Sequence, residues 1–272
     1  MDAIGRRPFL RAVGLVTSAL LAAPRRLWAQ TPPSSVGPAD PKLLEDLVAA
    51  NRILVDQGVL DGYGHVSVRH DRDPNRYLMS RSIAPELVTA ADILEYDLDN
   101  NPVDARGRTS YLERFIHGEI YKTRPDVKAV AHSHSPSVIP FGATGVSLRP
   151  LYHMSAFLWS GAPVFDIRAA SGEMTDMLVR NPALGRALAQ TLGANAVALM
   201  RGHGNVVVGT SLPHVVFRAV YTEINARLQA QAMALSTNVT YLDPEEAKKV
   251  ESALAGTIGR PWELWKRKAL GR

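Results

Sequence analysis

The hydrophobic and polar positions follow two different periods along the chain, and these predict both helices and strands. Apolar residues at helical spacing predict helices over residues 43–54, 111–123, 182–192 and 212–235. Short runs rich in β-branched residues predict strands over residues 65–69, 76–80, 93–98, 127–133, 164–167, 197–200 and 206–208. Hairpin-like turns join some strands and helices join others, so the sequence predicts a layered α/β fold whose sheet is not purely parallel.

Length and composition favour one large folded unit. The chain has 272 residues and 46% of them are hydrophobic, which is enough to bury one substantial core. We expect a single domain over residues 42–272, with two smaller domains as the alternative. Residues 30–41 include a Pro- and Ser-rich stretch and are predicted to form a flexible lead-in.

The first 29 residues have the pattern of an export signal. Arg6 and Arg7 precede an uncharged run over residues 12–24, and Ala29 offers a small residue for cleavage. This run is too short to remain as a membrane anchor. The arginine pair is typical of a signal read by the twin-arginine export machinery, with a Sec signal or a mitochondrial-type presequence as the alternatives. We therefore expect a mature protein that begins near residue 30 and resides in the periplasm.

Much of the basic excess belongs to this N-terminal segment. The whole chain has 31 Lys and Arg against 26 Asp and Glu, but five of the basic residues and one acid lie among the first thirty residues. The rest of the chain has a net charge of about +1. It lacks the clustered Lys/Arg stripe that nucleic-acid binding requires, so we expect no nucleic-acid partner.

Three histidines are candidates for metal binding. The chain has no cysteine, so a metal would need His and carboxylate ligands. His132 and His134 lie two residues apart at the end of a predicted strand, where their side chains leave the same face. His203 lies between two glycines in a predicted turn. Three imidazoles with an open position are typical of a catalytic zinc-type site, and ordinary polar residues at a sheet edge are the alternative.

Glu113 is the candidate carboxylate, near the start of a predicted helix. Ser110 and Glu113 also fit a capping box, in which the Glu113 side chain would bond to the Ser110 amide. Helix capping and a role at a metal site are therefore both open for this residue. No lysine lies within these motifs, so a Schiff-base mechanism has no candidate nucleophile.

Taken together, the motifs resemble those of the class II aldolase/adducin family, over roughly residues 42–240. The matching segments are Gly64-His65-Val66-Ser67-Val68-Arg69, Glu113-Arg114-Phe115-Ile116-His117, Tyr121, Arg124-Pro125-Asp126, Ala129-Val130, His132-Ser133-His134 and His203-Gly204. The resemblance implies a three-layer α-β-α fold with a central, mixed and largely antiparallel sheet, and a homotetramer with sites near subunit interfaces. It also implies a divalent metal beside Glu113, held by His132, His134 and His203. We expect Zn2+, with Mn2+, Co2+ and Fe2+ as alternatives.

Departures from the family's sugar-phosphate aldolases bear on the substrate. Tyr111 and Leu112 stand where those enzymes have hydroxyl residues that bind phosphate. Arg81 and Ser82 replace a Thr-Gly phosphate contact, and His65 replaces an Asn. An Arg at this place suits a planar carboxylate. We therefore expect a small unphosphorylated hydroxy or keto acid as the substrate.

The resemblance also suggests roles for individual residues. Glu113 is expected to act as an acid or base, and His153, with Tyr152 beside it, stands where the aldolases have a proton-donating Tyr. The expected substrate contacts are His65, Arg69, Ser80, Arg81 and Ser82. For Arg69 a surface charge on a strand is an equal alternative, and for Arg81 the alternative is an ion pair with an acid such as Glu86.

The predicted activity is that of a metal-dependent carbon-carbon lyase. The metal would act as a Lewis acid on a substrate with adjacent oxygens and stabilise the enolate-like charge that remains when the bond breaks. Some members of the family decarboxylate hydroxylated aromatic acids, and the pattern of His65, Arg81 and Tyr111 is more similar to theirs than to that of the sugar-phosphate enzymes. We expect decarboxylation. Retro-aldol cleavage or epimerisation is the next alternative, and a non-catalytic adducin-like binding module is the third.

Overall fold

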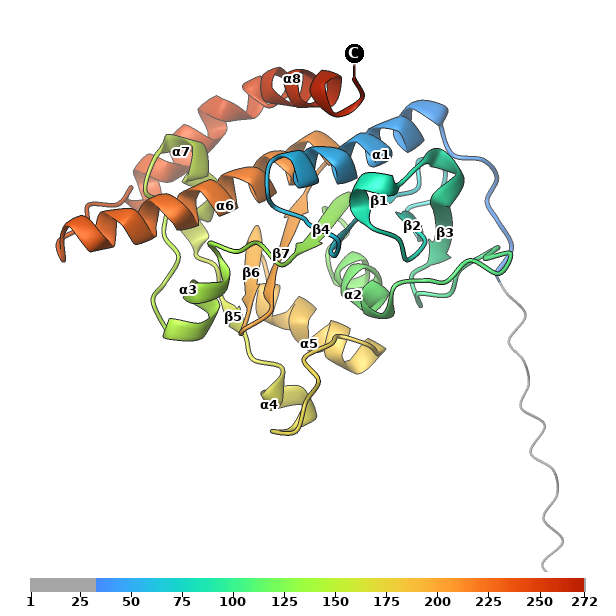
Figure 1. The fold of residues 1–272 in the computed structure, drawn as a ribbon, viewed down its shortest axis with the longest axis horizontal. Helices are drawn as coiled ribbons and strands as arrows, with labels where there is room; N and C mark the ends of the chain where they lie inside the picture. Colours follow the sequence, from blue (N-terminus) through green and yellow to red (C-terminus); the bar gives the residue numbers. More distant parts are fainter. Residues whose placement is uncertain (1–32, 272) are drawn as a thin grey trace, which may run out of the picture. The chain divides into compact units, whose positions relative to one another are not determined.

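One sheet of seven strands lies at the centre of the structure, a computed structural model that describes residues 33–271. The predicted signal peptide, with Arg6, Arg7 and Ala29, lies outside the described residues. The strands are β1 (His65–Arg69), β2 (Arg76–Ser80), β3 (Ile93–Asp97), β4 (Ala129–Ser133), β5 (Val164–Phe165), β6 (Val197–Met200) and β7 (Gly204–Gly209). They lie in the order β3-β2-β1-β4-β7-β6-β5, and all neighbouring pairs are antiparallel except β5 and β6 (Figure 1). The predicted mixed, largely antiparallel sheet is confirmed.

Helices cover both faces of the sheet, which gives the three predicted layers. α1 (Pro41–Asp56) and α6 (Leu212–Leu235) lie on one face, and α8 (Gly259–Ala269) packs against both of them. α2 (Phe115–Thr123) and α5 (Pro182–Leu192) lie together on the other face (Figure 1). The remaining elements are α3 (Ile139–Thr144), α4 (Arg168–Ser171), α7 (Pro244–Leu254), and the 3-10 turns η1 (Pro85–Leu87), η2 (Ala90–Asp92), η3 (Leu112–Arg114), η4 (His153–Ser160) and η5 (Ala255–Thr257). Within residues 33–271, none of the helices has the length and apolar character needed to cross a membrane.

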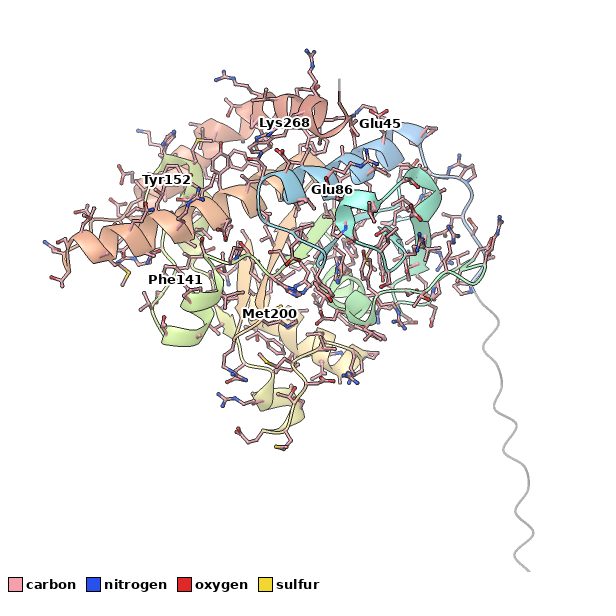
Figure 2. All side chains as sticks on the ribbon, viewed as in Figure 1. Glu45, Glu86, Phe141, Tyr152, Met200 and Lys268 are labelled. Atoms are coloured by element: carbon pink, nitrogen blue, oxygen red, sulfur yellow. The ribbon has the colours of Figure 1, made fainter. Side chains whose placement is uncertain are left out.

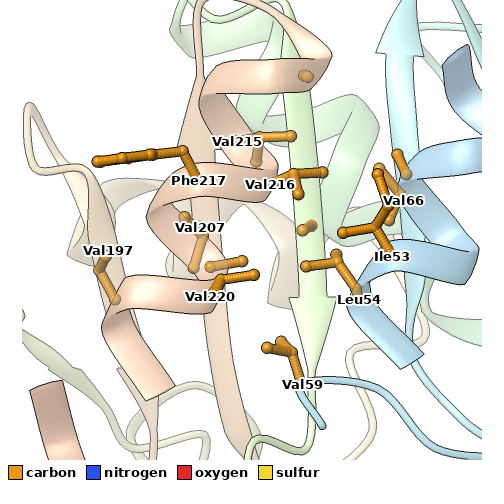
Figure 3. Close-up of a cluster of buried hydrophobic side chains, with 14 of the residues drawn as sticks. Ile53, Leu54, Val59, Val66, Val197, Val207, Val215, Val216, Phe217 and Val220 are labelled. Atoms are coloured by element: carbon orange, nitrogen blue, oxygen red, sulfur yellow. The ribbon is translucent and has the colours of Figure 1, made fainter. Parts of the chain in front are cut away.

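Successive strand residues point to opposite faces, so each central strand contributes to two hydrophobic cores. In β7, Val207 packs with residues of α1 and α6, whereas Val206 and Val208 pack on the side of α2 and α5. Figure 3 shows Val207 among labelled residues from α1 and α6. In β4, Val130 belongs to the core on the α2 side. His132, two residues further along β4, therefore leaves the sheet toward α2.

Polar caps and prolines determine where four helices begin. Asp40, Asn181, Ser211 and Asp243 each accept a backbone hydrogen bond at the start of a helix whose first turn contains a proline. These local signals explain why the predicted bounds of α5 and α6 agree with the structure. Helix α7 was not predicted from the sequence, although Asp243 and Pro244 are the same kind of start signal.

The described part of the predicted lead-in is held against the sheet. Ser35 Oγ donates to Glu95 of β3 at 2.6 Å, and Arg76 of β2 donates to the carbonyl of Ser34 at 3.2 Å. Asp40 caps α1 and so belongs to the domain. For residues 33–40, these contacts correct the prediction of a flexible lead-in.

Candidate metal centre

Strand pairing brings the three candidate histidines together. His132 lies in β4, and His134 follows directly beyond its end. His203 lies in the turn between β6 and β7, and the pairing of Ser133 with Asn205 places this turn beside the end of β4. The ring centroid of His203 is 5.0 Å from that of His132 and 4.9 Å from that of His134. Residues about 70 positions apart in the chain therefore face one another.

Glu113 completes a group of four side chains. Its Oε2 lies 3.5 Å from Nε2 of His132 and 3.5 Å from Nε2 of His203. The Nε2 atoms of His203 and His134 are 3.1 Å apart. One potential ligand atom from each of the four residues lies within 4.8 Å of all the others. Three imidazole nitrogens and a carboxylate oxygen at this spacing can hold one divalent ion.

Backbone carbonyls orient two of the imidazoles. Nδ1 of His132 lies 3.1 Å from the carbonyl oxygen of Asn205, and Nδ1 of His203 lies 3.1 Å from that of Met177. Because a carbonyl can only accept, Nδ1 of each ring carries a proton, which leaves Nε2 as the nitrogen that can bind a metal. The two Nε2 atoms face the centre of the group. A hydrogen bond from the far nitrogen is the usual support for a metal-binding histidine.

Glu113 is positioned by tertiary contacts and not by a helix cap. It lies in η3, and Oε1 accepts a hydrogen bond from the backbone N–H of Val179 at 2.9 Å. Ser110 Oγ accepts from the hydroxyl of Tyr96 instead of forming the capping box, and η3 has no side-chain cap. The capping-box alternative is therefore wrong for this residue. The predicted helix over residues 111–123 divides into η3 and α2, with a non-helical backbone at Glu113.

The burial and the pKa values of these side chains are compatible with a bound cation. His132 Nε2 is buried and has no hydrogen-bond partner among the described residues, which is a costly arrangement for a polar atom. Burial acts to raise the pKa of Glu113, but the neighbouring rings of His132 and His203 outweigh it and hold that pKa well below the usual range. Burial also lowers the pKa of His134 to about 4. An ionised carboxylate and uncharged imidazoles are the ligand forms that a divalent metal needs.

Two glycines allow the backbone to pass close to the centre. At Gly204, where φ is +159°, a Cβ would lie 1.9 Å from the carbonyl oxygen of Ser133. At Gly64, where φ is +86°, a Cβ would lie 2.8 Å from the carbonyl oxygen of His132. Both positions therefore need glycine for a close approach as well as for backbone freedom.

A cavity of about 330 Å³ opens beside the metal centre. Glu113, His134 and His65 contribute polar groups to its wall. Much of the remaining wall is apolar or aromatic, with Tyr63, Ile83, Ala84, Tyr111, Leu112 and Leu178. Among the described residues that line this cavity, none is Lys or Arg. Such a wall suits a flat apolar ring with a polar end directed at the four-residue group.

The structure places two of the five predicted substrate contacts at this cavity. His65 lies at the start of β1 and lines the cavity, as does Ser82. Ser80 is buried and does not line it. Its Oγ lies 3.3 Å from the hydroxyl of Tyr111, so Ser80 supports a residue of the wall.

Arg81 is engaged in an ion pair. Its Nε donates to Asp92 Oδ1 at 2.6 Å, and Arg81 is not among the residues that line the cavity. The alternative of an ion pair therefore describes Arg81 in this chain, with Asp92 as the acid in place of Glu86. Figure 2 labels Glu86 near α1.

Arg69 is buried at the opposite end of β1 from His65. Its guanidinium donates to four backbone carbonyls, those of Pro74, Tyr121, Arg124 and Val127. The Nε bond to Val127 measures 2.7 Å and an Nη2 bond to Tyr121 measures 2.6 Å. The structure thus corrects both alternatives from the sequence, because Arg69 neither reaches the cavity nor lies on the surface.

His153 and Tyr152 lie away from the metal centre of their own chain. Both are at the start of η4, and neither lines the cavity. His153 is exposed, whereas Tyr152 packs against Tyr221 of α6 with ring centroids 6.4 Å apart. Figure 2 shows Tyr152 near α6 and α7, well apart from Met200, which precedes the turn of His203. A role in catalysis would therefore require another copy of the chain.

Three residues that connect with His65 have no role predicted from the sequence. His65 Nδ1 lies 2.7 Å from Nε2 of His117, whose Nδ1 is 2.6 Å from Ser67 Oγ. Ser67 Oγ in turn lies 2.8 Å from the hydroxyl of Tyr121. Burial lowers the pKa of His117 to about 3, so its ring is uncharged. The spacing of Glu113, His117 and Tyr121 at intervals of four residues was the available signal, because it would place them on one side of the helix predicted over residues 111–123.

The chain matches the model of the class II aldolase and adducin N-terminal domain over residues 45–230. This match covers more than half of the chain and includes all four residues of the metal centre. The chain belongs to the class II aldolase/adducin family. The resemblance drawn from its motifs is thus confirmed.

Individual relatives within the family are decarboxylases and aldolases. The decarboxylase tropJ of Talaromyces stipitatus is 38% identical over 242 residues, which cover 81% of this chain and 91% of that protein. The 3,4-dihydroxyphthalate decarboxylase of Arthrobacter keyseri is 31% identical over 201 residues, which cover 69% of this chain and 77% of that protein. L-Fuculose 1-phosphate aldolase from Glaciozyma antarctica PI12 has a TM-score of 0.71 and 23% identity, and the match covers 89% of this chain and 96% of the aldolase. This last likeness shows the shared fold.

Proposed function

We propose that this protein is a divalent-metal-dependent lyase that decarboxylates a hydroxylated aromatic acid. Two relatives are decarboxylases by name, and one of them is named for 3,4-dihydroxyphthalate. The observation that carries the proposal is the cavity beside the metal centre, which has apolar and aromatic walls and no Lys or Arg among its described lining residues. Apolar and aromatic walls suit the ring of such an acid, and Tyr111 and Leu112 stand where the sugar-phosphate aldolases have hydroxyl residues that bind phosphate.

Different residues of this chain would bind the metal and the substrate. The four-residue group would hold the ion, and a bound divalent metal supplies a Lewis acid for the adjacent oxygens of the substrate. Tyr111 and Leu112 would cover the ring and limit access of water. The ring centroid of His65 is 4.5 Å from that of Tyr111, so His65 can contact a polar group at the edge of a bound ring. The Oε2 atom of Glu113 lies 3.5 Å from Nε2 of both His132 and His203, which favours a role for Glu113 as metal ligand.

The carbon that loses carbon dioxide must take up a proton. We assign this step to the segment with Tyr152 and His153 of a neighbouring copy in a homotetramer. This assignment is supported by the exposure of His153 and by the distance of both residues from the centre of their own chain. The sites would then lie near subunit interfaces.

Two other functions are alternatives to decarboxylation. Retro-aldol cleavage or epimerisation would use the same metal centre, and the fold shared with L-fuculose 1-phosphate aldolase favours it. A non-catalytic adducin-like binding module is less well supported, because all four potential metal ligands are present and lie within bonding reach of one ion. Neither alternative explains the apolar walls of the cavity as directly as an aromatic substrate does.

The test is release of carbon dioxide by the purified mature protein loaded with Zn2+, on a panel of hydroxylated benzoic and phthalic acids. We expect activity that is lost after chelation and strongly reduced in His203→Ala, because this variant lacks one of the four ligands and leaves a gap where the imidazole would hold the ion. His214→Ala is the matched control, since His214 lies in α6 outside the metal centre, and it should keep the activity. Cleavage of a phosphorylated sugar, with no turnover of any of these acids, would refute decarboxylation.

The identity of the metal and the cellular location of the protein are also part of the proposal. Three imidazoles and a carboxylate suit Zn2+, with Mn2+, Co2+ and Fe2+ as alternatives, and elemental analysis of the protein as purified distinguishes them. Export to the periplasm by the twin-arginine machinery is proposed from Arg6 and Arg7.

A further inference from the structure

Four buried side chains connect the cavity to the interior beneath α2. His65 lines the cavity, and its Nδ1 lies 2.7 Å from Nε2 of His117. Nδ1 of His117 is 2.6 Å from Ser67 Oγ, which is 2.8 Å from the hydroxyl of Tyr121. All four residues are at least 97% buried. Their polar atoms must therefore be satisfied within this series of hydrogen bonds.

Tyr121 determines which atom donates and which accepts in this series of hydrogen bonds. Its hydroxyl has one proton to donate, and Ser67 Oγ is the acceptor that it reaches among the described residues. Burial raises the pKa of Tyr121 well above its usual value, so the hydroxyl keeps its proton. Tyr121 therefore donates to Ser67, because the opposite direction would leave a buried O–H without an acceptor.

The donor and acceptor of the next two hydrogen bonds, which lead to His65, follow from this assignment. Since Ser67 Oγ accepts from Tyr121, its own O–H donates to Nδ1 of His117. An uncharged imidazole carries one N–H, so the proton of His117 is on Nε2, which donates to Nδ1 of His65. His65 then carries its own proton on Nε2, the nitrogen that remains for the cavity.

We propose that His117 is a positioning residue that holds His65 as the Nε2–H tautomer, so that His65 offers a neutral hydrogen-bond donor to an anionic oxygen of the substrate. The ring centroid of His65 is 5.2 Å from that of His132, which places this donor beside the metal centre. The arrangement is opposite to that of a histidine whose Nδ1–H donates to a carboxylate, where Nε2 is free to accept a proton. His65 is therefore a donor to the substrate and not a general base.

The substrate part of this inference rests on the proposed function, whereas the tautomer of His65 can be measured without a substrate. The measurement is 15N NMR of the zinc-loaded protein labelled with [15N]histidine, with the His65 signals assigned by their loss in His65→Asn. We expect a protonated Nε2 and an unprotonated Nδ1 that accepts a hydrogen bond. A protonated Nδ1 in the wild-type protein would overturn the proposal without any need for an active-site variant.

Two substitutions of His117 test the positioning role. His117→Gln can still place an amide N–H on Nδ1 of His65, whereas His117→Leu has a similar volume but no donor. We expect His117→Gln to keep most of kcat/KM on a decarboxylated acid and His117→Leu to lose at least ~10-fold, the effect of weakening one hydrogen bond to a charged group. The hydrogen-bonded Nδ1 signal should remain in His117→Gln and be lost in His117→Leu.

Tyr77→Phe is the matched control for a buried hydrogen bond that lies outside the series. Tyr77 is buried on the same side of the sheet, and its hydroxyl donates to Asn100 at 3.0 Å. This variant should lose stability but keep the His65 tautomer and kcat/KM. Equal kcat/KM in His117→Gln and His117→Leu would contradict the positioning role. If no acid is turned over by the wild-type protein, the proposed function fails, and the NMR result alone decides the tautomer.

Discussion

The backbone N–H of Val179 donates to Oε1 of Glu113 at 2.9 Å. This bond leaves Oε2 directed at His132 and His203, 3.5 Å from Nε2 of each. The loop before α5 and the turn before α2 therefore set the direction of the carboxylate together. Glu113, whose sequence context fits a helix cap, is instead one of the four side chains of the metal centre.

The first prediction concerns the charge of this carboxylate. Glu113→Gln keeps the side-chain volume and the acceptor for Val179, but it places a neutral amide against the imidazoles. We expect the affinity for Zn2+, measured by competition with a chelator, to fall at least ~10-fold because an ionised ligand is lost. Glu119→Gln is the control, since Glu119 of α2 is also buried but pairs with Lys122 at 2.7 Å. Equal affinity in Glu113→Gln and the wild type would show that Glu113 is not a ligand.

The second prediction concerns Arg69, which joins four backbone segments without reaching the cavity. Arg69→Met keeps much of the apolar length but removes every donor to the four carbonyls. We expect the free energy of unfolding to fall by about 3 kcal/mol or more, because charged donors to buried carbonyls are lost. Arg106→Met is the control, since the Arg106 side chain is 80% exposed and its pairing with Asp104 contributes little. Chemical denaturation measures both, and the metal content of folded Arg69→Met should equal that of the wild type.

The third prediction concerns the close approach of β7 to the end of β4. In Gly204→Ala, the added Cβ would lie 1.9 Å from the carbonyl oxygen of Ser133, so the strands must separate beside the metal ligands. We expect a loss of about 3 kcal/mol or more in stability, together with weaker metal binding. Gly256→Ala is the control, because nothing lies within 4 Å of a Cβ there. Thermal unfolding and metal analysis of both variants provide the comparison, and a wild-type melting temperature in Gly204→Ala would contradict the packing described here.

The fourth prediction concerns export. The twin-arginine machinery reads the arginine pair itself, whereas a Sec signal needs only positive charge. Replacing both residues, Arg6→Lys with Arg7→Lys, should therefore keep the protein in the cytoplasm as the precursor. Cell fractionation with detection of the mature form measures the outcome. Normal amounts of mature protein in the periplasm would exclude this route.

Much of the secondary structure could be predicted from local sequence. The predicted bounds of α6, β1 and β2 agree with the structure because hydrophobic periodicity and capping act over a few residues. The histidine of the Gly-His-Gly turn and the His-x-His pair could also be identified as candidate ligands from sequence. The family motifs then predicted that His132, His134 and His203 form one group, which the structure brings together.

The sequence by itself thus determined the elements, the family and the candidate ligands, whereas tertiary structure decided which polar groups meet. Val179 and Glu113 are separated by 66 residues, and nothing in the local sequence indicates that their hydrogen bond replaces a helix cap. Arg69 was assigned by sequence to the cavity or the surface, but the packing of β1 against α2 buries it among carbonyls from other segments. Such contacts depend on strand register and on the packing of helices against the sheet. These relationships form only when the whole chain has folded, because no single segment contains both partners.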